Sequence, residues 1–274
     1  MLLQAFIAGN EVQVSYCSEQ LYFRLARTDH PVAAAMQQLL FPISVMNVDL
    51  PASLWMSITA LGSIGVMLPV GLAAAAWLAL GYGWKYTIQW LALLGAGSGC
   101  VALSKIAFIG WGVGMRNIDF TGISGHAFMA TAVLPVACFV ALLPARGAVR
   151  AGGVALGLLL GVVVGGSRVV VNAHSVSEVV TGCALGGAVA IAFVSIAWRA
   201  EPGKLSPTPV TASLCAVVVA LHGVPVPTQH WITEIALGLS GHGRPYVRAR
   251  WKAKIYRAPE RRADLYAPRY RAAA

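Results

Sequence analysis

Residues 151–198 read AGGVALGLLLGVVVGGSRVVVNAHSVSEVVTGCALGGAVAIAFVSIAW. Two apolar runs, Ala151–Ser167 and Val179–Trp198, flank a polar segment that carries Arg168, His174 and Glu178. Each run approaches the length of about 20 residues that a helix needs to cross a bilayer. The stretch therefore predicts two membrane-spanning helices with ionisable side chains at the connection between them.

The composition of the whole chain agrees with this prediction. Of the 274 residues, 58% are hydrophobic and 11% are charged, whereas about 25% of the residues in a typical soluble domain are charged. So few charges cannot cover a water-facing surface, which argues against a soluble enzyme, a disordered protein and a coiled coil. We expect an all-α, polytopic transmembrane helical bundle.

About six spans are expected, in segments that lack Asp, Glu, Lys and Arg. The first is centred on SITALGSIGVMLPVGLAAAAWLAL, and the glycines within the spans suit close helix contacts in lipid. Four of the five cysteines lie in apolar runs and are interpreted as buried free thiols. The predicted spans lie within Leu50–Trp84, Tyr86–Ser104, Phe120–Ala145, Ala151–Ser167, Val179–Trp198 and Leu205–Thr233.

The chain is expected to have three parts: an N-terminal segment (1–48), a transmembrane domain (49–226) and a basic C-terminal tail (227–274). In the first part, Val32–Asn47 is apolar but interrupted by polar residues and proline, and it is interpreted as interfacial, re-entrant or an additional span. The N-terminus has no basic region before its short apolar stretch, so no cleavable signal peptide is expected.

The number of crossings predicts which connections share a side. Two crossings separate His126 from Arg168, so the segments 105–126 and 167–175 must face the same side. The short loops of the other side carry Lys85, Arg146, Arg150, Arg199 and Lys204, and positive loops are typically cytoplasmic. The segments 105–126 and 167–175 are therefore predicted to face outward, into the periplasm of a Gram-negative cell.

The basic tail disagrees with this orientation if the sixth span crosses fully. Residues 241–274 hold ten Lys or Arg residues but only two acids, and the crossing would place them outside. Either the region Leu205–Ser240 is a re-entrant hairpin, or the tail is external.

Ionisable residues gather in the two outward segments, and at membrane depth such residues are candidates for function. The first segment supplies Lys105, Arg116, Ser124, Gly125 and His126, and the second supplies Ser167, Arg168, His174 and Glu178.

The residue types predict a phosphate site. If the second segment is helical, His174 and Glu178 share a face, and a carboxylate on one ring nitrogen leaves the other as a nucleophile or base. Thr121 or Ser124 can cap the helix that follows, whose free amides attract an anion. Three cations with few acids suit a phosphate better than a metal ion.

Each residue taken singly also has a structural interpretation. A histidine at a helix start is usually a capping or hydrogen-bonding residue, and lysine or arginine at the end of a span often extends toward the headgroups. Glu178 and His174 could form a structural pair between helices. The ordered spacing of all of them on one side is what favours a catalytic interpretation.

With these motifs, the sequence resembles the type 2 phosphatidic-acid phosphatase family, the membrane relatives of vanadium haloperoxidases. The family motifs are K-x6-RP, PSGH and SR-x5-H-x3-D. Ser167-Arg168, five residues, His174, three residues and Glu178 correspond to the third motif, and Ser124-Gly125-His126 to the second. The resemblance covers about residues 50–200.

The resemblance implies a six-helix bundle with an outward active site and a metal-independent phosphohydrolase without a cofactor. It assigns His174 as the nucleophile that forms a phosphohistidine, Glu178 as its orienting carboxylate and His126 as the general acid. The groups that would hold the phosphoryl oxygens are Ser124, the Gly125 amide, Arg168 and Lys105, and Arg116 is a further candidate.

The sequence departs from the family motifs at three places. Ile123 replaces a proline, and Glu178 is one methylene longer than the family aspartate. Ten residues rather than six separate Lys105 from Arg116, and Asn117 follows in place of proline. The departure in the first motif bears most directly on the role of Arg116.

The function expected is hydrolysis of a lipid phosphate or diphosphate of the undecaprenyl diphosphate, phosphatidic acid, phosphatidylglycerophosphate or lipid A type, in a bacterial inner membrane. Two alternatives stay open. One is an anion transporter, although the sequence lacks the internal repeats typical of that class. The other is a non-catalytic scaffold whose tail, rich in Arg, Lys, Tyr and Trp, binds anionic lipid. No nucleic-acid partner is expected.

Overall fold

The computed structural model describes residues 51–200 and 206–249. The segment Val32–Asn47 and the tail from residue 250 onward lie outside the described residues. The described residues fall into two compact units: a bundle unit (51–101, 123–200 and 206–226) and a second unit (102–122 and 227–249).

The described residues form an all-α structure, as the sequence predicts. The helices of the bundle unit are α3 (Ala52–Leu61), α4 (Ile64–Gly81), α6 (Gly125–Ala141), α7 (Gly147–Val170), α8 (Val176–Ala197) and α9 (Pro207–Leu221). The long helix α5 (Trp84–Trp111) runs from the bundle unit into the second unit, which also holds the 3-10 turn η1 (Arg116–Ile118) and α10 (Thr228–Ser240).

The protein is an integral membrane protein with four candidate spans among the described residues, where about six were expected. These spans are Ala52–Gly81, Trp84–Trp111, Gly147–Val170 and Val176–Ala197. The other two expected spans correspond to α6 and α9, which have 17 and 15 residues. At 1.5 Å per residue they are about 26 and 22 Å long, shorter than a hydrocarbon core of about 30 Å.

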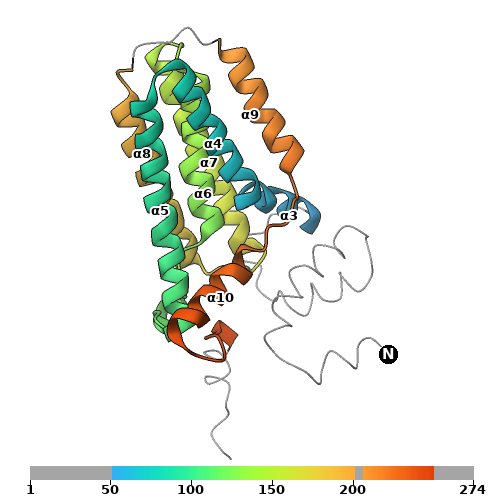
Figure 1. The fold of residues 1–274 in the computed structure, drawn as a ribbon. Coiled ribbons are helices and arrows are strands. Elements are labelled where there is room, and N and C mark those ends of the chain that lie inside the picture. The colour runs from blue at the N-terminus through green and yellow to red at the C-terminus, as the bar shows by residue number, and fades with distance from the viewer. Residues whose placement is uncertain (1–50, 201–205, 250–274) are drawn as a thin grey trace, which may run out of the picture. The chain divides into compact units, whose positions relative to one another are not determined.

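The first expected span is divided into two helices. The break falls at Gly62 and Ser63, where Ser63 has an extended backbone (ψ 149°) and serves as the N-cap of α4. Figure 1 shows α3 set at an angle to α4. The apolar sequence continues through the break, so composition alone does not reveal it.

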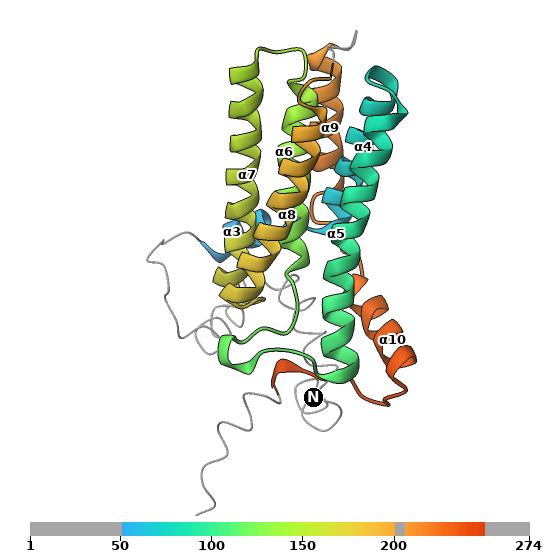
Figure 2. The same ribbon diagram turned by 90° about the vertical axis from the view of Figure 1, so that its left-hand side faces the viewer.

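The helix α6 is the centre of the bundle unit. It packs against α4, α7 and α8, and in Figure 2 it lies beside α7 and behind α8. Most of its residues from Ala127 to Ala141 are buried, with Phe128 and Phe139 at most 1% exposed. A helix that is apolar all round fits this central place.

Glycines bring α7 and α8 close to the backbone of α6. A Cβ built on Gly157 would lie 2.6 Å from Pro135 Cα, and one on Gly161 would lie 2.7 Å from Thr131 Cα. On α8, a Cβ at Gly182 would lie 2.7 Å from the Ser124 carbonyl oxygen. The close helix contacts predicted from the glycine content are therefore present.

Among the described cysteines, all are free thiols, but not all are buried as expected. Cys138 and Cys183 are half-buried, whereas Cys100 and Cys215 are exposed. Apolar helices in lipid can present cysteine outward because the surrounding solvent is itself apolar.

One end of the bundle unit gathers arginine and tryptophan. Arg150, in the first turn of α7, donates to the Trp198 carbonyl at 3.2 Å, and its guanidinium lies 4.8 Å from the centre of the Trp198 ring. The Trp198 ring also stacks on Phe139. The turn between α6 and α7 and the end of α8 therefore lie together, away from the start of α6.

The helix α9 runs antiparallel to α4. Near the end of α4, the Trp77 indole donates to the Ser213 hydroxyl at 2.9 Å. At the beginning of α4, a Cβ on Gly65 would lie 3.2 Å from the Val224 carbonyl oxygen, just after α9.

Candidate active site

The start of α8 holds His174 against Glu178. The Glu178 carboxylate accepts from His174 Nδ1 at 2.7 Å and from the Ser175 amide at 3.3 Å, while the Ser175 hydroxyl accepts from the Glu178 amide. When Glu178 is ionised its carboxylate only accepts, so that Nδ1 carries the proton and the Nε2 lone pair of a neutral ring is left for chemistry. Glu178 is 0% exposed and the His174 side chain 16%.

This contact has a different origin from the one expected. The two residues were predicted to share one helical face, but α8 begins at Val176, so His174 lies before the N-cap Ser175. Glu178 is the third residue of the helix and forms a capping box with Ser175. The same carboxylate therefore closes the helix end and orients the imidazole.

A tight turn connects Arg168, at the end of α7, to His174, just before α8. The Arg168 carbonyl, in the last turn of α7, accepts from the amides of Ala173 and His174 at 3.0 and 3.2 Å. Asn172 has a positive φ of 52°, which this reversal requires. The five residues between Arg168 and His174 are those needed to fold the chain back from α7 into α8.

The Arg168 side chain is buried in the bundle unit. It is 7% exposed, and its Nη1 donates to the Thr59 hydroxyl of α3 at 3.3 Å. A buried guanidinium needs hydrogen-bond partners to offset the loss of hydration. Sequence reasoning missed Thr59, because an isolated threonine in an apolar helix carries no signal of such a contact.

The start of α6 presents Ser124, Gly125 and His126. Ser124 is the N-cap, but its side chain does not make the cap that was expected. The Thr121 hydroxyl instead accepts from Arg248. The Ser124 hydroxyl is fully buried and has no hydrogen-bond partner among the described residues. A buried hydroxyl at a helix N-terminus that bonds to no described residue can donate to an anion.

Backbone contacts bring the second and third motifs together. The Ser124 amide donates to the Glu178 carbonyl at 3.1 Å, which joins the start of α6 to the first turn of α8. On the opposite side of α6, a Cβ on Gly62 would lie 3.1 Å from the His126 carbonyl oxygen. His126, Arg168 and His174 therefore lie at one end of the bundle unit.

Lys105 and Arg116 belong to the second unit and are described there. Lys105 lies in the last two turns of α5, and its Nζ donates to the Gln229 side-chain oxygen at 3.5 Å. Arg116 begins the turn η1 and is exposed. Their convergence with the two histidines stays a prediction.

The segment 242–248 fastens to the end of α5 and to the loop after it. The His242 ring bonds to the Gly110 carbonyl at 2.7 Å, and the Tyr246 amide donates to the Ile109 carbonyl at 2.9 Å. Arg248 donates to the Thr121 hydroxyl at 3.0 Å and pairs with Asp119 at 3.5 Å. Sequence reasoning, which treated this segment as part of a basic tail, did not anticipate these contacts.

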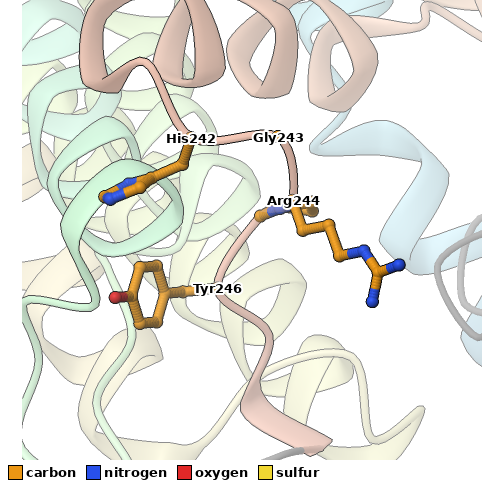
Figure 3. A pocket seen from close by; sticks show the side chains of 5 residues that line it. His242, Gly243, Arg244 and Tyr246 are labelled. Carbon is orange, nitrogen blue, oxygen red and sulfur yellow. The ribbon is translucent and has the colours of Figure 1, made fainter.

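The same segment forms a pocket of about 330 Å³. Figure 3 shows the rings of His242 and Tyr246 on one side of it and the Arg244 side chain extending to the other. The pocket is lined by His242, Gly243, Arg244, Pro245 and Tyr246. Within residues 51–200 and 206–249, no group of three His, Cys, Asp or Glu residues could hold a metal ion.

Comparison with known proteins adds two similarities. Residues 70–202 match the sequence model of the PAP2 superfamily. A protein of Klebsiella pneumoniae, described as "Uncharacterized 22.5 kDa protein in cps region", is 38% identical over 166 residues, which cover 58% of this chain and 78% of the relative. No solved structure matches the chain.

Proposed function

Because this chain belongs to the PAP2 superfamily and carries its phosphatase domain, we propose that it removes phosphate from a lipid phosphate or lipid diphosphate in the membrane. The observation that carries the proposal is the hydrogen bond between the buried Glu178 carboxylate and His174 Nδ1. It leaves Nε2 as the nucleophile, at the end of the bundle where Arg168 and the Ser124 hydroxyl also lie.

The first step is transfer of the phosphoryl group to His174. Nε2 attacks phosphorus, the N–P bond forms, and the bond from phosphorus to the leaving oxygen breaks. His126 gives its proton to that oxygen, so the lipid leaves as an alcohol or a monophosphate. Glu178 stabilises the positive charge that develops on the imidazole ring.

Charge on the equatorial oxygens needs fixed donors, since phosphoryl transfer depends mainly on positioning and electrostatic stabilisation. Arg168, the Ser124 hydroxyl and the Gly125 amide supply these donors in the bundle unit. Lys105 and Arg116 are proposed to complete the cradle. In the second step His126 takes a proton from water, which attacks phosphorus and releases inorganic phosphate and free His174.

The proposed substrate is presented from the outer leaflet of a bacterial plasma membrane. The basis is the arginine-rich opposite end of the bundle unit, which carries Arg146 and Arg150 and is expected to face the cytoplasm. Undecaprenyl diphosphate, phosphatidic acid, phosphatidylglycerophosphate and a lipid A phosphate share the group that the site would recognise.

A phosphate-release panel over these four lipids, in detergent, tests the function. We expect release by the wild type and its loss in His174→Ala, with release unchanged by EDTA. His230→Ala is the matched control, because His230 also pairs with a glutamate four residues on, Glu234 at 3.0 Å, but on an exposed surface. Near-normal release by His174→Ala would contradict the proposed nucleophile, and loss of release in EDTA would favour a metal-dependent reaction.

A further inference from the structure

We propose that Thr59 is a positioning residue that holds the Arg168 guanidinium in the orientation required to bind phosphate. This inference rests on the proposed function. Thr59 lies on α3, before the residues that match the superfamily. Its hydroxyl accepts from Arg168 Nη1 at 3.3 Å across 109 positions of sequence, and both side chains are buried, at 2% and 7% exposed.

The contact constrains the plane of the guanidinium. Arginine has five N–H donors in a rigid fork, so fixing one nitrogen limits the directions of all the others. A phosphate group is best held by two parallel N–H bonds, which require that the fork already faces it. The Thr59 hydroxyl occupies one donor without adding a negative charge, so the cation stays available to an anion.

The position of α3 is itself fixed near the site. A Cβ on Gly62, one turn after Thr59, would lie 2.5 Å from Val164 Cγ1 and 3.1 Å from the His126 carbonyl oxygen. Val164 lies one turn before Arg168 on α7. The end of α3 therefore packs against both α6 and α7 beside the residues proposed to act, which places Thr59 firmly enough to orient Arg168.

The test compares Thr59→Ser with Thr59→Ala, which differ only in the hydroxyl. Inorganic phosphate is the probe, as a competitive inhibitor of lipid-phosphate hydrolysis. We expect Thr59→Ser to bind phosphate within about twofold of the wild type, and Thr59→Ala to weaken it about tenfold, as loss of a hydrogen bond to a charged group does. KM should rise with the inhibition constant in Thr59→Ala.

Thr131 offers a matched control. It is 1% exposed, and its hydroxyl donates to the Ala127 carbonyl of its own helix at 2.7 Å. Thr131→Ala and Thr131→Ser should therefore have the same inhibition constant for phosphate. The Thr59→Ala effect should also shrink to less than about twofold in an Arg168→Lys background, because coupled residues are not additive.

Two failures are distinguishable. If the wild type releases phosphate but Thr59→Ala and Thr59→Ser bind inorganic phosphate equally, Thr59 does not position Arg168 and the inference is overturned while the function stands. If the wild type releases no phosphate from any lipid of the panel, the proposed function fails. Thermal unfolding of both variants shows whether either has lost the fold. A Thr59→Ser variant that is folded but binds inorganic phosphate about tenfold more weakly than the wild type would also contradict the inference.

Discussion

At the scale of single residues, burial separates two pairs with the same spacing. His174–Glu178 and His230–Glu234 are both four apart and both bonded, at 2.7 and 3.0 Å. In the second pair the side chains are 55% and 63% exposed, and an exposed pair of this kind contributes little to the stability of the fold. In the first pair Glu178 is fully buried and also accepts from the Ser175 amide, so its geometry is fixed.

Glu178→Gln is expected to lower kcat about 100-fold, in the range for a group that assists proton transfer. The amide still accepts from His174 Nδ1, but it lacks the charge that stabilises the imidazolium. Glu234→Gln is the control and should retain the wild-type rate. The measurement is phosphate release from the preferred lipid. Equal rates for Glu178→Gln and the wild type would show that the carboxylate serves only the helix cap.

At the scale of elements, glycine spacing decides how closely the helices approach. Gly153, Gly157 and Gly161 recur every four residues on the buried face of α7. Gly152 is adjacent in sequence but faces away, and a Cβ there would meet nothing within 4 Å. The same amino acid therefore has two roles on one helix, and the contact with α6 distinguishes them.

Gly157→Ala is expected to destabilise the protein, because its Cβ would lie 2.6 Å from both Cα and N of Pro135. Backbone cannot move aside as a flexible side chain can, and overpacking of this kind costs about 1–3 kcal/mol. Gly152→Ala should leave the unfolding temperature unchanged or slightly raised. Thermal unfolding in detergent, followed by tryptophan fluorescence, measures both. Equal unfolding temperatures would show that α6 and α7 can separate without cost.

At the scale of the whole molecule, the bundle unit has two chemically different ends. One end carries the site residues at the start of α6, the end of α7 and the start of α8. The other carries Arg146, Arg150 and Arg199, and Arg150 is fixed on Trp198. Because loops rich in Lys and Arg are typically cytoplasmic, the arginine-rich end is expected to face the cytoplasm and the end with the site residues to face outward.

Single cysteines at the two ends test this orientation. In a variant without the native cysteines, Val176→Cys at the start of α8 should react with a membrane-impermeant maleimide in intact cells. Ala148→Cys, in the first turn of α7, should react only after the membrane is opened. Both positions are exposed, so reactivity reports the side. The reverse pattern of labelling would place the site in the cytoplasm and exclude a substrate from the outer leaflet.

The class of fold and the pairing of His174 with Glu178 could be predicted from the sequence alone. Apolar runs free of charge require helices in lipid, since backbone groups there must bond within the segment. The spacing of Arg168, His174 and Glu178 is local, because it covers one turn between two helices. Features that depend only on residues close together in the chain can therefore be predicted from the sequence.

Four features required the folded structure: the break between α3 and α4, the short length of α6, the Ser124 hydroxyl that makes no helix cap, and the contact of Thr59 with Arg168. Each depends on residues far apart in the chain. The apolar sequence around Thr59 is compatible with many helix positions, and packing of Gly62 against α6 and α7 selects one of them. Close packing rather than hydrophobicity makes that selection, because lipid is as apolar as the helices themselves.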